Sequence, residues 1–373
     1  MIMDRISILH VIHDLGFGGA QRLLTDLVLN IDQQRYAPSV AVLYSPQAAP
    51  YEEELRKRNI RVSYLGKHPG LDVGAVFRLG TVLRDVRADI VHTHCHALRY
   101  ALPHVLARRV RVAVHTVHNL AAQDAGRPRW LMALAYKAGV VPVAIGEEVA
   151  TSLNQVFGIA NPPLIRNGID VQRFAMPSTS REAVRSALGL ENELTFICAA
   201  SLTPKKGHPI LLDAFARVVQ RMPTAKLLLA GTGLMRQPME AQVSRLGLGP
   251  NVRFLGARSD MPDLLAAADV FVLSSFWEGM PLSVMEAMAA GKPVVCTAVG
   301  GSIEIVQDGV NGFLVPSGYS VLLANAMIEM ADPEKRALFG KRAAETASAQ
   351  FGLGTMVRAY EVLYEKLLSR GKR

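Results

Sequence analysis

Short apolar runs that resemble strands alternate with helix-like runs along this chain, and the whole pattern occurs twice. A strand-like run at 6–12 is followed by a helix-like run at 20–31, and a second such pattern begins after Asn167-Gly168. This alternation predicts parallel sheets with helices on their faces, because parallel strands need a crossover connection. The chain has 373 residues, which is enough for two such domains. The expected strands are 6–12, 39–44, 90–93 and 111–116 in the first half, and 194–199, 225–229, 252–254, 270–273 and 293–296 in the second, with a further helix at 74–86.

The joint between the two halves is expected near 162–180, which is rich in Pro, Gly and Ser. We therefore place an N-terminal domain at 1–170 and a C-terminal domain at 171–350. The end of the chain has apolar residues at helical spacing, and it predicts a final helix at 351–368.

The chain is basic, with a formal net charge of +9. A basic surface favours an anionic lipid, a phosphate-bearing acceptor or nucleic acid, and a solvated face without a partner is the alternative. Nucleic acid is the weakest of these, because there is no helix-turn-helix, zinc-finger or aromatic RNA-binding motif. The arginines gather locally, with Asp124 as the only acid between them: Arg99, Arg108, Arg109, Arg111, Arg127 and Arg129.

Part of this basic region, 99–111, also predicts a helix with an apolar face and basic flanks, as expected of an element in a lipid interface. Pro103 is expected in the first turn of that helix. The competing interpretation is that the apolar face packs on a sheet. The face consists of Tyr100, Leu102, Val105 and Leu106.

Cysteine usage and the apolar runs favour a cytoplasmic protein. Cys95, Cys198 and Cys296 are far apart, which does not resemble a disulfide framework or a zinc motif. The first apolar run is short and reads as a strand rather than a signal peptide. The longest apolar stretch, 130–145, is too short and too broken by charge and proline to span a bilayer.

Two carboxylates mark the most specific segment of the chain. Glu278 lies on the loop after the strand 270–273, and Glu286 lies in the helix that follows. Ligands of open α/β sheets bind outside the carboxyl ends of the strands. A carboxylate accepts hydrogen bonds from two vicinal hydroxyls, so this pair suits a sugar and a ribose. The alternative is a surface acid followed by an ordinary helical glutamate.

Glycine-rich turns and a lysine predict phosphate binding. Gly16, Gly18 and Gly19 follow a strand and open a helix, where backbone N–H groups attract anions. Gln21 stands where a dinucleotide fingerprint needs another glycine, so an oxidoreductase is disfavoured. A tight turn without a ligand is the alternative. Lys206 is a point cation that suits a diphosphate.

Histidines offer further candidates. His118 closes a strand, although a lone histidine is usually a core residue. His92, His94 and His96 alternate, so all three are expected on one face of an extended segment. This spacing leaves a metal site open as an alternative, but no carboxylate completes it. A place for His94 in an acceptor pocket is the other interpretation.

Taken together, the motifs resemble glycosyltransferase family 4, whose members are retaining enzymes of the GT-B fold. The resemblance covers nearly the whole chain. It is carried by the segment 269–295, by Gly16-Phe17-Gly18-Gly19-Ala20-Gln21, His115-Thr116-Val117-His118, Arg166-Asn167-Gly168-Ile169-Asp170, Lys205-Lys206-Gly207-His208, Gly231-Thr232-Gly233 and Asp308-Gly309-Val310-Asn311-Gly312.

The resemblance implies two Rossmann-like domains that face each other across a cleft, with the final helix, 351–373, packing back on the N-terminal domain. It implies transfer of a hexosyl group from a nucleotide diphosphate sugar to a glycan or lipid-linked acceptor, without a metal or other cofactor. The acceptor is expected on the N-terminal domain and the donor on the C-terminal domain. The implied catalytic residues are His118, Glu278 and Lys206; the donor-binding residues are Gly16, Gly18, Gly19, Ser201, Lys206, Gly231, Glu278, Gly279, Met280, Pro281, Leu282 and Glu286; and the acceptor-binding residues are His94, Arg108 and Arg109.

Ser201 is the main departure from the family pattern, because most relatives have an arginine at this position. Its loss removes a bidentate phosphate contact. Lys205 or another cation then compensates, or the leaving group is less well stabilised. A non-catalytic sugar-nucleotide-binding protein of a polysaccharide assembly system is therefore the alternative function. The sequence leaves the base, the sugar and the acceptor open.

Overall fold

The computed structural model describes residues 5–46, 50–125 and 128–370. The chain divides into two compact units, unit 1 (1–168 and 353–373) and unit 2 (169–352). Arg127 lies outside the described residues.

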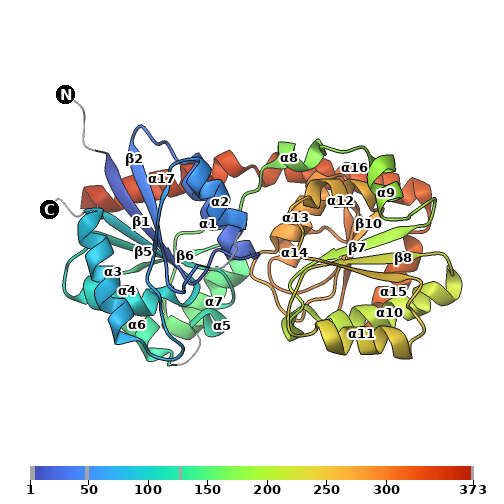
Figure 1. The fold of residues 1–373 in the computed structure, drawn as a ribbon, viewed down its shortest axis with the longest axis horizontal. Coiled ribbons are helices and arrows are strands. Elements are labelled where there is room, and N and C mark those ends of the chain that lie inside the picture. Colours follow the sequence, from blue (N-terminus) through green and yellow to red (C-terminus); the bar gives the residue numbers. More distant parts are fainter. Residues whose placement is uncertain (1–4, 47–49, 126–127, 371–373) are drawn as a thin grey trace. The chain divides into compact units, whose positions relative to one another are not determined.

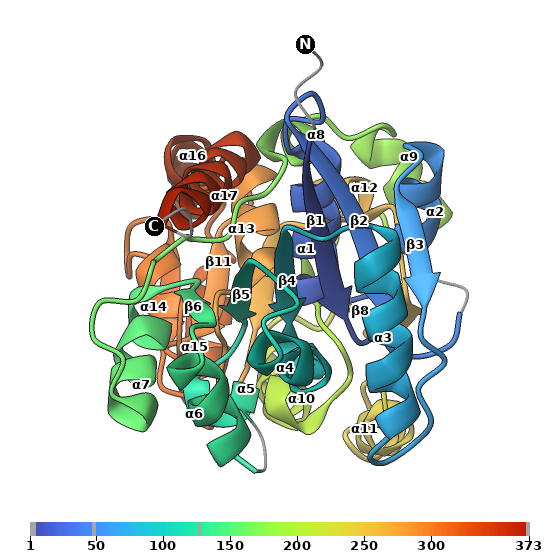
Figure 2. The same ribbon diagram turned by 90° about the vertical axis from the view of Figure 1, so that its left-hand side faces the viewer.

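Unit 1 contains a six-stranded parallel sheet in the order β3-β2-β1-β4-β5-β6. Figure 1 draws its ribbon, and Figure 2 labels each of these strands. Its central strands are almost fully buried, because helices cover both faces of the sheet. The strands are β1 (Ile6–Ile12), β2 (Tyr36–Val42), β3 (Arg61–Tyr64), β4 (Ile90–His94), β5 (Val112–Val117) and β6 (Val141–Ala144).

Two apolar clusters fix the helix layers of unit 1. On one face, Leu79 and Tyr100 pack against strands β1 and β4. On the other face, Leu24 and Leu55 pack against β1 and β2. Figure 2 shows α3, α4 and α6 side by side along one side of this unit. The helices are α1 (Gly19–Asn30), α2 (Pro50–Lys57), α3 (Val73–Asp85), α4 (Leu98–Leu106), α5 (Ala121–Ala125), α6 (Trp130–Lys137), α7 (Glu147–Phe157) and α17 (Leu353–Arg370).

Helix α4 differs from the sequence-based expectation. It starts at Leu98 after a 3-10 turn, so Pro103 lies well inside it and not in its first turn. Tyr100 and Leu102 are buried in the core of unit 1, and only Leu106 of the predicted apolar face is half exposed. The interpretation of this face as packing on the sheet is therefore correct for most of its residues.

The last helix, α17, packs against strands β4 and β5 of unit 1 through buried tyrosines. The Tyr364 hydroxyl lies 2.7 Å from His92 Nδ1, and the Tyr360 hydroxyl lies 2.9 Å from Thr116 Oγ1. Arg111, which precedes β5, also donates a hydrogen bond to the Leu368 carbonyl of α17 at 3.0 Å. A helix from the end of the chain is thus part of the N-terminal unit.

Unit 2 repeats the same topology, with the order β12-β11-β10-β7-β8-β9. In Figure 1 the sheet lies between a layer with α10, α11 and α15 and a layer with α9, α12, α13 and α16. The strands are β7 (Thr195–Ala199), β8 (Lys226–Ala230), β9 (Val252–Gly256), β10 (Val270–Leu273), β11 (Val294–Thr297) and β12 (Gly312–Val315); the helices are α8 (Val171–Ala175), α9 (Arg181–Ala187), α10 (His208–Arg221), α11 (Arg236–Arg245), α12 (Met261–Ala267), α13 (Leu282–Ala289), α14 (Ser302–Ile305), α15 (Ser320–Glu329) and α16 (Pro333–Gln350).

Three strands escaped the sequence analysis. Strand β3 is a short edge strand with no strong apolar run, and β12 begins within a glycine-rich turn. Strand β6 lies in the apolar stretch 130–145, which the structure divides between α6 and β6. Within the described residues, we find no helix that combines the length and the hydropathy needed to cross a bilayer.

Candidate active site

The strand order places the predicted donor residues of unit 2 at the carboxyl ends of neighbouring strands. The order reverses between β7 and β10, and in such sheets the ligand crevice lies outside the carboxyl ends of these two strands. Ser201 and Lys206 follow β7, and Glu278 follows β10. Residues that are far apart in the sequence therefore come to the same edge.

Glu278 is the centre of this arrangement and is only 4% exposed. Its carboxylate lies 2.5 Å from Lys206 Nζ and 3.8 Å from Lys205 Nζ. The Ser275 hydroxyl donates a hydrogen bond to the same carboxylate at 2.5 Å. Burial raises the pKa of Glu278, but the charges of Lys206 and Lys205 outweigh it and bring the pKa below its ordinary value. A buried carboxylate is thus held ionised beside two cations.

Two glycines allow the loops at this edge to pack closely. Gly207 (φ +62°) and Gly300 (φ +53°) both have left-handed backbone, which favours glycine. A Cβ atom on Gly207 would overlap the carbonyl oxygen of Ser274, and one on Gly300 would overlap that of Glu278. The Gly301 amide also donates to the Gly279 carbonyl at 2.7 Å. These contacts fix the backbone that carries Glu278.

Further predicted donor residues follow Glu278 in the sequence. Met280 and Leu282 are buried at the start of α13, Pro281 is its N-cap, and Glu286 is half-buried within the helix. Their roles in donor binding stay predictions, as does the assignment of Glu286 to a ribose.

Ser201 and Gly231 lie on the loops that leave β7 and β8. Ser201 is exposed, with its hydroxyl 3.4 Å from that of Thr203. The Gly231 amide donates to the Gly256 carbonyl at 2.7 Å. Lys205 supplies a second cation beside Glu278, which is one way to compensate for the arginine that Ser201 replaces.

The glycine-rich loop of unit 1 follows β1 and opens α1, as predicted. The Gly16 amide donates to the Asp14 carboxylate at 2.8 Å, and Gln21 Nε2 donates to the same oxygen at 2.9 Å. Gly18 is the N-cap of α1, and no side chain caps that helix end. A phosphate at this loop would therefore be bound by amides other than that of Gly16, so the predicted Gly16 contact requires a change at Asp14.

His118 directly follows β5 and is partly buried. Its backbone amide donates to Asp124 at 3.2 Å, and Asp124 also accepts a hydrogen bond from His115 Nε2 at 3.1 Å. Burial raises the pKa of Asp124, but the hydrogen bond and charge of His115 outweigh it and lower the pKa overall. Burial lowers the pKa of His118 to about 4, although the charge of Asp124 opposes this shift. His118 is thus neutral at physiological pH.

His94 lies behind His118 and is fully buried. His94 Nδ1 lies 3.0 Å from His118 Nε2, and His94 Nε2 lies 3.4 Å from His10 Nδ1. In this conformation the ring of His94 is not accessible, so its predicted direct contact with an acceptor would need a rearrangement. His10, on β1, did not figure in the sequence-based site.

The predicted common face of three alternating histidines is wrong for His96, which lies in the 3-10 turn after β4. His10, His92 and His94 instead have ring nitrogens within 4.8 Å of one another, close enough for a metal site. His92 already uses both nitrogens, with Tyr364 and with the Thr116 hydroxyl at 2.7 Å. A metal ion bound by His92 would have to displace one of these hydroxyls, so hydrogen bonding explains the cluster more simply.

Arg108 and Arg109 are not brought together with His94. They are exposed and follow the C-terminal end of α4, whereas His94 precedes its start. A helix of 9 residues separates them, a length of about 13 Å. Arg99 is also engaged, because it donates to the Ala125 carbonyl at 2.6 Å.

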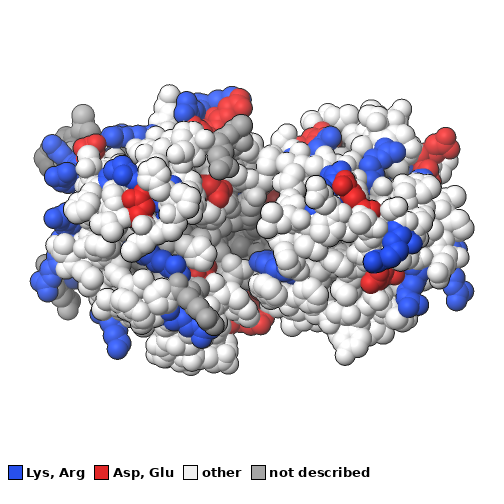
Figure 3. Space-filling view, turned by 60° about the horizontal axis from the view of Figure 1, so that its bottom comes forward, with Lys and Arg blue, Asp and Glu red and all other residues white. Residues whose placement is uncertain are grey.

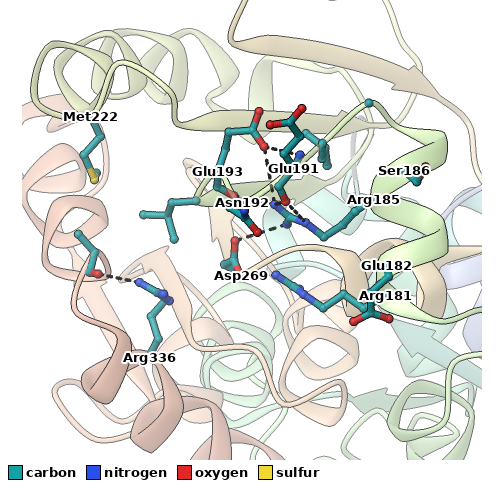
Figure 4. A pocket seen from close by; sticks show the side chains of 14 residues that line it. Arg181, Glu182, Arg185, Ser186, Glu191, Asn192, Glu193, Met222, Asp269 and Arg336 are labelled. Atoms are coloured by element: carbon teal, nitrogen blue, oxygen red, sulfur yellow. Dashed lines mark hydrogen bonds and ion pairs between the residues drawn. The ribbon is translucent and has the colours of Figure 1, made fainter.

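A cavity of about 690 Å³ lies elsewhere in unit 2 (Figure 4). Its lining includes Asp269, which precedes β10, so it lies at the amino ends of the strands, opposite to Glu278. Arg185 donates to the carbonyls of Glu191 and Glu193, and Arg181 pairs with Asp269 at 2.6 Å. These guanidinium groups are occupied by protein acceptors, and the predicted donor residues lie at the opposite ends of the strands.

Sequence comparisons identify the family. A family model described as Glycosyltransferase Family 4 matches residues 17–173, and one described as Glycosyl transferases group 1 matches residues 180–346. The chain belongs to glycosyltransferase family 4. This family 4 chain is 27% identical to the UDP-Gal:alpha-D-GlcNAc-diphosphoundecaprenol alpha-1,3-galactosyltransferase of Escherichia coli, over 79% of each protein. It is 28% identical to the N-acetyl-alpha-D-glucosaminyl L-malate synthase of Bacillus anthracis, over 82% of each.

Solved structures agree with the fold of this family 4 glycosyltransferase. Anabaena HepE in complex with UDP and glucose has a TM-score of 0.85 and 26% identity, covering 97% of this chain and 100% of HepE. Sucrose-phosphate synthase from Thermosynechococcus elongatus has a TM-score of 0.85 at 21% identity, covering 98% of this chain and 100% of the synthase, and supports the fold alone. The predicted GT-B fold class is confirmed.

Sequence reasoning missed Ser275, Asp124 and His10 as members of these sites. Ser275 and Asp124 are close in sequence to predicted residues, and such proximity is a weak signal. His10 gave no signal in the sequence, because it interrupts an apolar strand as any core histidine does.

Proposed function

We propose that this glycosyltransferase transfers a sugar from a nucleotide diphosphate sugar to a glycan or lipid-linked acceptor, with retention of anomeric configuration. The observation that carries the proposal is the buried Glu278 carboxylate beside Lys205 and Lys206 at the switch point of unit 2. A carboxylate suits sugar hydroxyls, and the ammonium groups suit a diphosphate. HepE, which resembles this chain over its whole length, was solved with UDP-glucose.

In the proposed reaction, the acceptor hydroxyl oxygen bonds to C1 of the donor sugar as the C1–phosphate oxygen bond breaks on the same face. The leaving phosphate oxygen takes the acceptor proton. Lys205 and Lys206 stabilise the negative charge that develops on the diphosphate, so catalysis consists largely of positioning and electrostatic stabilisation.

A thermal-shift screen against UDP-, GDP- and ADP-sugars tests the proposal, because a ligand that binds only the native state raises its stability. We expect one nucleotide series to raise the melting temperature, and that donor to be consumed with a suitable acceptor. The alternative, motivated by Ser201, is a sugar-nucleotide-binding protein without turnover. Donor binding without transfer to any glycan or lipid-linked acceptor would favour that alternative.

Lys206→Ala is expected to weaken nucleoside diphosphate binding by about tenfold or more, because a buried charge-assisted contact is lost. Calorimetry with the diphosphate measures the change. Lys205→Ala is the matched control, since Lys205 lies farther from Glu278 and should have a smaller effect. Equal affinity in Lys206→Ala and the wild type would place the phosphate contact elsewhere. Ser201→Arg, which introduces the usual family residue, should tighten binding.

Activity is expected to survive EDTA. The proposed cations are side chains, and the sequence near Glu278 contains no Asp-x-Asp pair of the kind that holds a catalytic divalent ion. Transfer assays with and without the chelator measure this directly. Complete loss with recovery on adding a divalent ion would revive a site at His10, His92 and His94.

We also propose that unit 1 binds an anionic membrane surface near a lipid-linked acceptor. Arg108 and Arg109 are exposed and follow helix α4, whose last residue, Leu106, is 50% exposed. Helix α6, which contacts α4, exposes Trp130 (63%) and Leu134 (38%). Basic residues beside apolar ones favour a lipid interface. On the face drawn in Figure 3, basic side chains lie in several separate places.

Binding to anionic vesicles is expected at low salt and should fade at high salt, with about 1 kcal/mol per arginine near the surface. Changing Arg108 and Arg109 to Glu should weaken it. In the control variant, Arg217 and Arg245, two exposed arginines of unit 2, are changed to Glu. Equal sedimentation with neutral and anionic vesicles, or equal loss in the control, would favour a soluble acceptor.

A further inference from the structure

Three histidine rings of unit 1, those of His10, His94 and His118, form a continuous row of contacts, called the histidine chain below, that ends at the candidate site. His10 on β1 contacts His94 on β4, and His94 contacts His118 after β5. Each contact joins one ring nitrogen to another, at 3.4 Å and 3.0 Å. A neutral imidazole has one N–H donor and one acceptor nitrogen, so both bonds form only if all three rings carry their proton on equivalent atoms.

The rings are neutral because their surroundings disfavour charge. His10 and His94 are completely buried. Burial lowers the pKa of His10 to about 3 and the pKa of His94 well below its ordinary value, and the neighbouring histidines lower the latter further. Asp124 is the one acid that we find facing this region within the described residues, and its carboxylate is bound to His115 and to the His118 amide.

Only two proton arrangements satisfy both contacts. In the first, the protons are on Nε2, so that His118 donates to His94 and His94 donates to His10. The N–H group on His10 Nε2 then has no acceptor. In the second, the protons are on Nδ1 and the donation runs in the opposite direction, from His10 to His94 to His118. His10 Nε2 is buried and has no hydrogen-bond partner among the described residues.

This orphaned nitrogen decides between the two arrangements. A buried N–H without a partner is rarer and more costly than a buried acceptor without one. The second arrangement leaves only an unused lone pair on His10 Nε2, so it is the more stable. It also leaves an N–H group on Nδ1 of His118, the nitrogen that His94 does not engage.

We propose that His10 and His94 are positioning residues that hold the proton of His118 on Nδ1, so that His118 presents a hydrogen-bond donor, not a base, at the end of β5. The row of histidines ends at His10, because His10 Nε2 has no described group to which it could pass a proton. It therefore cannot relay the acceptor proton away. His118 donates to a substrate oxygen instead, and the acceptor proton leaves with the phosphate. The identity of that substrate rests on the function proposed above.

Long-range ¹H–¹⁵N correlation of the full-length, histidine-labelled protein at pH 7 measures the tautomers directly. We expect all three rings to be neutral with the proton on Nδ1, and signals are assigned from single variants of each histidine. A proton on Nε2 of His118, or a doubly protonated ring, would overturn the proposal. This experiment needs no substrate, so it can fail or succeed independently of the proposed function.

A matched pair at position 94 tests the direction of donation. His94→Asn places its amide group near the position of Nδ1 and keeps a donor for His118, whereas His94→Gln places it near the position of Nε2 and removes that donor. We expect the His118 tautomer to persist in His94→Asn and to become mixed in His94→Gln. With a donor found in the thermal-shift screen, kcat should fall about tenfold further in His94→Gln than in His94→Asn. Melting temperatures of both variants control for folding. Equal kcat in two folded variants, or the same tautomer in both, would contradict the positioning role.

Discussion

Replacing Glu278 with Gln is expected to lower the rate of sugar transfer by about two orders of magnitude, an effect typical of removing one preorganised electrostatic group. The substitution keeps the size of the side chain and an acceptor for the Ser275 hydroxyl. It removes the charge that faces Lys206 and Lys205, and with it the carboxylate proposed to bind the sugar. Steady-state transfer with the best donor from the screen gives the change in kcat.

The control for this experiment is Glu329→Gln. Glu329 also forms an ion pair, 2.8 Å from Lys335, but both side chains are substantially exposed. Loss of such a pair changes stability by about 0–1 kcal/mol, so transfer should be unaffected. Glu286→Gln is the informative companion, because Glu286 is expected to act on the ribose and to alter KM more than kcat. Wild-type transfer in both Glu278→Gln and Glu286→Gln would refute the donor-site assignment.

Acidification is expected to unfold unit 1 before unit 2. Four histidines of unit 1, three of them buried and one, His118, partly buried, have a pKa that is lowered because burial disfavours the charged ring; the other three are His10, His92 and His94. Each stays neutral in the folded state, while the unfolded chain binds protons below pH 6.5. The stability is therefore fully present above pH 6.5 and is lost as the pH falls towards the folded-state values.

The size of this effect follows from proton linkage. With a folded-state pKa of about 3, His10 alone removes about 2 kcal/mol of unfolding free energy between pH 7 and pH 5. Four such groups remove several kcal/mol, a large part of the roughly 5–15 kcal/mol that stabilises a domain. Unit 2 contributes one comparable residue, His208, whose pKa is lowered to about 4 mainly by burial. Unit 2 is therefore the internal control.

Hydrogen exchange in urea, followed by mass spectrometry, separates the two units, because peptides from β1 and β4 report on unit 1 and peptides from β7 and β10 on unit 2. The pH slope for unit 1 should exceed that for unit 2. His10→Leu should reduce the slope by about one proton, whereas the exposed His68→Gln should leave it unchanged. Parallel pH dependence of the two units would show that the buried histidines do not control acid stability.

Much of the fold was predictable because its signals are local. Strands β1 and β10 begin and end where the apolar runs predict, since burial on both faces requires continuous apolar sequence. Strand β3 was missed because a short edge strand needs no such run. Pro103 was misplaced because a 3-10 turn precedes α4, and local pattern does not specify that turn.

By itself, the sequence determined that the chain has two α/β halves, and that Glu278, Lys206, His94 and His118 lie at or beyond the carboxyl ends of strands, because periodicity and turn residues act over a few positions. Tertiary structure alone decided which of these residues meet. The strand orders bring Lys206 to Glu278 across 72 residues and His10 to His94 across 84. These contacts arise from the packing of whole layers, and that packing also orphans His10 Nε2 and sets the direction of the histidine chain.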